Sequence, residues 1–311
     1  TKLKKETGGL TPDITGAENH CTIIAIAPSP VDEMVIWAGT DDGNVQVTTD
    51  GGKTWTNTSG AMPGCPKNAW IPQIEVSARN AGEAFVVVNH YRFNDWRPYL
   101  YHTKDFGKSW ERVADEKQVD GFCLSVVQDP AVESLLFLGT DKGLYMSMDA
   151  GKNWTKWKEF PSVPIYDMKI HPREHDLILG TFGRSIWIMD NITPLREIAG
   201  TNAEVFKKPF AVFKPAKAYQ ADWRSDEGVR FGADAYFRGA SKSTAADFMV
   251  WLKKPENKDD KSVKGFVLKS GQSELKLVKS DSTQAEKGMK GDSTKVGKKD
   301  DKKDDKKKVT M

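Results

Sequence analysis

Five carboxylic side chains lie at turns of this sequence from which they could meet across a cleft: Glu18, Asp41, Asp42, Asp95 and Asp141. Hydrolysis of a glycosidic bond requires two carboxyl groups, about 5 Å apart for retention or about 6.5–9.5 Å apart for inversion, one of them with a raised pKa. Either Asp41 or Asp42 could form such a pair with one of the other three. The alternative is turn chemistry, because Asp accepts backbone hydrogen bonds beside turn glycines.

Aromatic, basic and histidine side chains accompany these carboxylates, most densely in the enlarged turn at 89–98. Extra loop length with Tyr, Trp and Arg is what a binding edge uses. The candidates for ligand contact are His20, Trp70, His90, Tyr91, Arg92, Trp96, Arg97, Lys142 and Arg184. Each has a structural alternative: hydrogen-bonded histidines, arginines that brace their own loop, and an Arg184 ion pair with a neighbouring sheet.

A repeated hairpin must position these residues. Its pattern is a hydroxyl residue, Asp two later, Gly two after that, and Trp three beyond the Gly. The Asp can accept backbone N–H bonds across a tight turn, the Gly tolerates positive φ, and the Trp buries a large ring. The three copies are Thr48, Asp50, Gly52, Trp55; Thr103, Asp105, Gly107, Trp110; and Ser147, Asp149, Gly151, Trp154.

Short apolar strands surround each hairpin. In the first unit, 23–27 and 34–38 predict two strands, 45–47 leads into the hairpin, and a fourth strand starts near Trp55. Four strands in about forty residues is a spacing expected of radial repeats. Similar units run from about 71 to 113 and from 122 to 157, and a fourth begins at Ile165 without a hairpin Gly or Trp.

This pattern resembles the Asp-box, or BNR repeat, of sialidases, the sortilin family and xyloglucanase-type glycosidases. The phrases at 37–47, 171–177 and 180–185 are similar to large sortilin-like BNR-repeat proteins of bacteria, often labelled glycosyl hydrolases. The resemblance implies an all-β chain with a partial β-propeller of four-stranded blades, followed by a small β-sandwich. Because those relatives are longer, it also implies upstream blades, in the same precursor or on another chain, and a secreted, periplasmic or cell-surface location. A closed ring of four blades is the alternative.

The expected organisation has four parts. Residues 1–20 are a linker or the outer strand of a preceding blade, and 21–198 hold about four blades. A connecting strap follows at 199–230, and 231–311 form a β-sandwich-like domain, cut short at the end of the sequence. Within that domain, the lysine- and aspartate-rich segment 287–308 has almost no apolar residue, which predicts disorder.

Composition removes several classes of function. A net charge of +3, without a basic face interleaved with aromatics, gives no support for a nucleic-acid partner. Three cysteines argue against a disulfide framework and against metal sites built on paired cysteines, although a Cys21–Cys65 bridge stays open. No cofactor or metal site is expected, and no apolar run is long enough to cross a membrane.

Blade geometry then selects one face. In an up-and-down blade, the turns between strands one and two and between strands three and four share one face, which the Asp-boxes mark. Ligands in resembling propellers meet the opposite face, where the candidates above lie. Two hypotheses follow: a non-catalytic module that binds protein or glycan, and a glycoside hydrolase that uses a carboxylate pair on that face.

Overall fold

The structure is a computed structural model that describes residues 21–218 and 246–253 of the chain. Glu18, His20, the linker at 1–20 and the segment 287–308 lie outside the described residues. So does most of the expected β-sandwich, which therefore stays a prediction.

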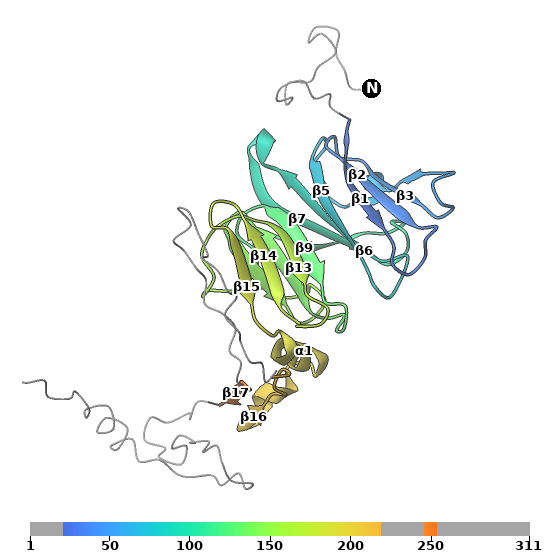
Figure 1. Cartoon of the computed structure of the whole chain (residues 1–311). Helices are drawn as coiled ribbons and strands as arrows, with labels where there is room; N and C mark the ends of the chain where they lie inside the picture. The colour runs from blue at the N-terminus through green and yellow to red at the C-terminus, as the bar shows by residue number, and fades with distance from the viewer. Residues whose placement is uncertain (1–20, 219–245, 254–311) are drawn as a thin grey trace, which may run out of the picture. The chain divides into compact units, whose positions relative to one another are not determined.

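Three four-stranded antiparallel sheets follow one another along the chain, and within each sheet every strand pairs with the next in sequence (Figure 1). Blade 1 consists of β1 (Ile23–Pro28), β2 (Ile36–Thr40), β3 (Val45–Thr48) and β4 (Thr56–Asn57). Blade 2 consists of β5 (Trp70–Val76), β6 (Ala84–His90), β7 (Asp95–Thr103) and β8 (Glu111–Ala114). Blade 3 consists of β9 (Cys123–Gln128), β10 (Leu136–Thr140), β11 (Gly143–Ser147) and β12 (Thr155–Lys156).

Blade 4 has three strands in the described part of the chain: β13 (Ile165–Ile170), β14 (Leu177–Thr181) and β15 (Ile186–Met189). Helix α1 (Thr193–Gly200) then leaves the repeat, with Pro194 in its first turn, where a missing N–H costs little. Strands β16 (Phe210–Val212) and β17 (Val250–Leu252) form a separate two-stranded pair. The predicted all-β, partial-propeller fold with four-stranded Asp-box blades is confirmed.

The core consists of three layers between consecutive blades, because alternate residues of each strand point to opposite faces. On β6, Val86 and Val88 join the core shared with blade 1, whereas Phe85 and Val87 join the core shared with blade 3. Blades 3 and 4 enclose a third core, which Ala199 of α1 also enters. The inner blades are therefore covered on both faces, and the rim residues between them have rigid supports.

The three Asp-boxes share one hydrogen-bond pattern. In the first box, Asp50 accepts from the Thr54 N–H at 2.9 Å and from the Thr48 hydroxyl at 2.8 Å, and the Gly52 N–H donates to the Thr48 oxygen at 2.9 Å. Each box also donates one backbone N–H to the turn between the first two strands of its blade: Gly51 to Met34, Phe106 to Gly82 and Ala150 to Ser134, each at 2.9 Å. These turns therefore lie at one end of every blade.

Candidate functional site

Two of the candidate carboxylates, Asp41 and Asp141, lie at the opposite end of the blades, where they hold the entry to the first strand. Asp41 accepts from the backbone N–H groups of Cys21 and Thr22 at 2.9 and 2.8 Å. Asp141 has the equivalent role in blade 3 and accepts from the Phe122 N–H at 3.0 Å. Gly121 must be a glycine here, since a Cβ would lie 1.9 Å from Asp141 Oδ1. Both carboxylates thus brace the chain about twenty residues upstream.

Asp42 serves its own turn. Its carboxylate accepts from the Thr40 hydroxyl at 2.5 Å and from the Asn44 side-chain amide at 2.9 Å. The side chain is buried. This is the turn chemistry that the sequence offered as the alternative to catalysis.

Asp95 begins β7 directly after the enlarged turn, which contains one 3-10 turn (Tyr91–Phe93) and Asn94 at φ 60°. Its carboxylate accepts two hydrogen bonds from the Arg97 guanidinium, both at 2.8 Å, and one from the Tyr99 hydroxyl at 2.8 Å. The hydrogen bonds from Arg97 hold the pKa of Asp95 well below its usual range. A general acid for glycoside hydrolysis needs the opposite shift.

Aromatic rings from three segments gather beside this turn, and we call Trp70, Tyr91, Arg92, Trp96 and Phe122 the aromatic rim cluster. The Tyr91 ring stacks on Phe122 at 4.7 Å, and Trp96 lies 5.7 Å from Phe122. The Arg92 guanidinium lies 3.3 Å from the Trp70 ring centroid, a close cation–π contact. Trp96 remains 54% exposed and so offers a large ring face to solvent.

An open groove of about 790 Å³ runs past this cluster between blades 2 and 3. His90, Phe93, Asp95, Trp96, Glu116 and Asp120 are among the residues that line it. Its size falls within the range of small-molecule sites, and its lining mixes exposed rings with carboxylates and Arg97. The sequence predicted His90, Asp95, Trp96 and Arg97 at a shared rim, but gave no signal for Phe122, Glu116 or Asp120.

Two predicted rim residues, Lys142 and Arg184, make contacts outside the aromatic rim cluster, and buried polar atoms of blade 2 have no hydrogen-bond partner among the described residues. Lys142 forms an ion pair with Asp120 at 2.7 Å, next to the groove. Arg184 lies in the exposed β14–β15 turn, where its carbonyl accepts from the Trp187 indole at 3.0 Å, and it does not line the groove. Trp70 Nε1 and Asn89 Oδ1 are buried without a hydrogen-bond partner among the described residues.

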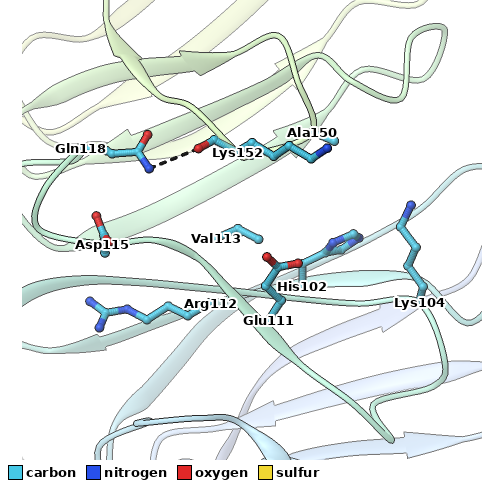
Figure 2. A pocket seen from close by; sticks show the side chains of 10 residues that line it. His102, Lys104, Glu111, Arg112, Val113, Asp115, Gln118, Ala150 and Lys152 are labelled. Atoms are coloured by element: carbon cyan, nitrogen blue, oxygen red, sulfur yellow. Dashed lines mark hydrogen bonds between the residues drawn. The ribbon is translucent and has the colours of Figure 1, made fainter.

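A second hollow of about 230 Å³ lies between β7 and β8 of blade 2 and the Asp-box of blade 3. Figure 2 shows His102 and Glu111 on one side of it, and Gln118 bonded to the Lys152 carbonyl at 3.2 Å on the other. Its volume is below the range usual for ligand sites. We therefore read it as a crevice of the blade interface.

Glu75 is a titratable residue that sequence reasoning missed. It lies on β5, and burial raises its pKa to about 7, whereas attraction to Lys169 on β13 acts in the opposite direction. An acidic residue in the strand pattern 70–76 gave no sign of this, because the effect comes from strands of other blades. No group of three or more His, Cys, Asp or Glu in the described ranges could hold a metal ion.

The repeat and the sheets define the class of fold: the chain is a partial β-propeller that carries a BNR, or Asp-box, repeat. The profile described as "BNR/Asp-box repeat" matches residues 46–57. The chain is 32% identical over 95 residues to an oligoxyloglucan-reducing end-specific xyloglucanase of Emericella nidulans, covering 30% of this chain and 11% of that enzyme. The match therefore spans a small fraction of the enzyme's length.

Solved structures with related architecture include the GH74 xyloglucanase from Xanthomonas campestris, at TM-score 0.47 and 17% identity, covering 54% of this chain and 29% of that one. YCF48 bound to D1 peptide has TM-score 0.39 and 19% identity, covering 56% of each chain. Among the described residues, no helix is long and apolar enough to span a membrane.

Proposed function

We propose that this chain is a non-catalytic binding module of the sortilin-like kind, which holds a glycan or a protein segment along the groove beside the aromatic rim cluster. The observation that carries the proposal is the exposed ring of Trp96 beside an open groove with polar walls. Exposed aromatic rings with adjacent hydrogen-bonding groups suit sugar rings, and Trp, Tyr and Arg also dominate protein-binding hot spots. We further infer that the module acts outside the cytoplasm, by resemblance.

Hydrolysis is the alternative, and the similarity to a xyloglucanase is what favours it. A hydrolase of this kind needs one carboxyl with a raised pKa and a second one free to act. At the rim, burial raises the pKa of Asp141, but Asp41, Asp42 and Asp141 each hold a turn or strand entry, and Asp95 is bound to Arg97. These contacts favour binding over catalysis.

The test compares Trp96→Ala with Trp55→Ala, because both indoles are exposed and Trp55 lies at the opposite, Asp-box end. Both variants and the wild type would be screened on glycan and peptide arrays, and hits measured by calorimetry. We expect Trp96→Ala to weaken binding about 10- to 30-fold, in line with the loss of about 1.4–2 kcal/mol at a hot spot, with Trp55→Ala unchanged. Equal affinity in Trp96→Ala would refute the proposed site.

A second measurement separates binding from hydrolysis. Bound glycans would be incubated with the protein and assayed for new reducing ends. We expect none. Turnover by the wild type that disappears in Asp95→Asn would establish the hydrolase alternative.

A further inference from the structure

The inner strands of the four blades carry an apolar residue at one equivalent register position. The last residue of each inner strand pairs with the first residue of the second strand: Pro28 with Ile36, Val76 with Ala84, Gln128 with Leu136, and Ile170 with Leu177. Two residues before that pair lie Ile26, Ile74, Val126 and Met168. The three later residues belong to the cores that their blades share with the preceding blade.

Exposure separates blade 1 from this series. Ile74, Val126 and Met168 are 6%, 0% and 1% exposed, whereas Ile26 is 69% exposed. Ile24, at the register shift in β1, is also exposed. Blade 1 thus has the apolar face with which its successors pack on a preceding blade, and none of the described residues covers it.

The Asp-box tryptophans show the same difference. The Trp154 indole donates to the Val113 carbonyl on β8, the fourth strand of the preceding blade, at 2.7 Å. The Trp110 ring meets Trp37 of blade 1 edge to face at 5.9 Å. Trp154 and Trp110 are only 7% and 8% exposed, whereas Trp55 is 44% exposed. In the described part of the chain, the first Asp-box therefore has no preceding blade of the kind on which the other two boxes pack.

Blade 4 is exposed on its other face, the one on which a following blade would pack. The third strands of the four blades also have one equivalent position, which is paired with the fourth residue of the second strand. It is occupied by Val45, Leu100, Leu144 and Ile186 in blades 1 to 4. Val45, Leu100 and Leu144 are 0% exposed beneath the following blade, whereas Ile186 is 67% exposed. Among residues 21–218 and 246–253, the uncovered blade faces are thus those at the two ends of the row of blades.

We propose that the open face of blade 1, formed by Ile24, Ile26 and Trp55, binds a complete four-stranded blade supplied from outside this 311-residue sequence. The partner face is apolar, like the surface of Trp37, Val45 and Val47 that helps to cover Ile74. Its fourth strand offers a backbone carbonyl to the Trp55 indole, as β8 does to Trp154.

Two other occupants fit the face less well. Twenty residues precede the described part, fewer than the span from Ile23 to Asn57 that blade 1 needs, and all three Asp-box patterns already belong to blades 1–3. A second copy could present its blade 4, but β15 is the outermost strand described there. That sheet would leave the Trp55 indole without its fourth-strand carbonyl.

The test places a photo-crosslinking residue, p-benzoylphenylalanine, at Ile26 in cells that make the protein. The control position is Val31, which is similarly exposed but lies in the β1–β2 turn. We expect mass spectrometry to find crosslinks from Ile26, and not from Val31, to a strand of an Asp-box blade that is absent from these 311 residues. Crosslinks to residues 177–189 of another copy, or no excess over Val31, would overturn the proposal.

A measurement on the purified chain gives an independent check. We expect light scattering to give a monomer of 34.7 kDa, and an apolar dye to bind less to Ile26→Ser than to the wild type. A stable dimer that Ile26→Ser returns to monomer would overturn the proposal in favour of self-association.

Discussion

Glu75 makes the stability of this protein depend on pH in a direction opposite to that of most carboxylates. Burial raises its pKa from 4.5 to about 7, despite the attraction of Lys169, and the nearby Asp167 adds to the rise. A carboxyl with a raised folded-state pKa keeps its proton after the unfolded chain has released it. The contribution of Glu75 therefore lowers the free energy of unfolding as the pH rises from about 4.5 to 7, and this contribution does not change further above pH 7.

The magnitude follows from the shift. A difference of 7 − 4.5 = 2.5 pKa units corresponds to about 3 kcal/mol at 1.36 kcal/mol per unit. Because Glu75 keeps some contact with solvent, we expect a loss of about 1–3 kcal/mol. Glu75→Gln preserves the shape and removes the titration, so the variant should equal the wild type near pH 4 and exceed it by about 1–3 kcal/mol at pH 8.

Urea unfolding followed by tryptophan fluorescence at pH 4, 5, 6, 7 and 8 measures this difference. Glu159→Gln, at an exposed position outside the strands, is the matched control and should track the wild type at every pH. A constant difference between Glu75→Gln and the wild type from pH 4 to 8 would show that Glu75 ionises normally and would refute the reasoning.

Two further predictions concern the hairpins. Hydrogen bonds, above all from Thr54 and Ser109, lower the pKa of Asp50 and Asp105 from 3.8 to about 2, so the stability that these carboxylates contribute is complete above pH 3.8 and is lost as the pH falls through 2. The melting temperature should therefore fall less from pH 5 to pH 2 for Asp105→Asn than for the wild type, and equal falls would contradict this. Gly107→Ala should lower the free energy of unfolding in urea by about 1–3 kcal/mol more than Gly64→Ala does. Both glycines have positive φ, but only at Gly107 would a Cβ lie 2.6 Å from a neighbour, the Thr58 side chain. Equal losses would show that Thr58 moves aside.

Local sequence was sufficient to predict the blades, because each blade is defined within about forty residues. The Asp-box joins a hydroxyl, an Asp and a Gly within five positions, so its spacing is visible in the sequence. The hydrogen bonds of Asp41 to the Cys21 and Thr22 N–H groups were less visible, since these partners lie about twenty residues upstream. The local sequence around Asp41 indicated only a turn. Motif reasoning thus placed the turns but not what their carboxylates hold.

The aromatic rim cluster was predictable from the sequence except for Phe122, for the same reason. Tyr91, Arg92 and Trp96 are conspicuous within one enlarged turn. Phe122 begins another blade and meets them only because β9 packs beside blade 2. A lone Phe ahead of a strand is a normal core residue, so its pattern gave no hint of the rim. Contacts between blades therefore require the structure.

The groove and the open face of blade 1 are separable parts of the molecule. The groove lies between blades 2 and 3, whose shared core contains Phe85, Leu100 and Leu136 and is closed on both sides. Ile26 projects from the end of the row, on the face of blade 1 that points away from the core shared with blade 2. Substitution at Ile26 should therefore leave ligand binding intact, and Trp96→Ala should leave crosslinking at Ile26 intact. If either substitution abolished both properties, the ligand would have to bridge the groove and the added blade, and the binding site would extend beyond these four blades.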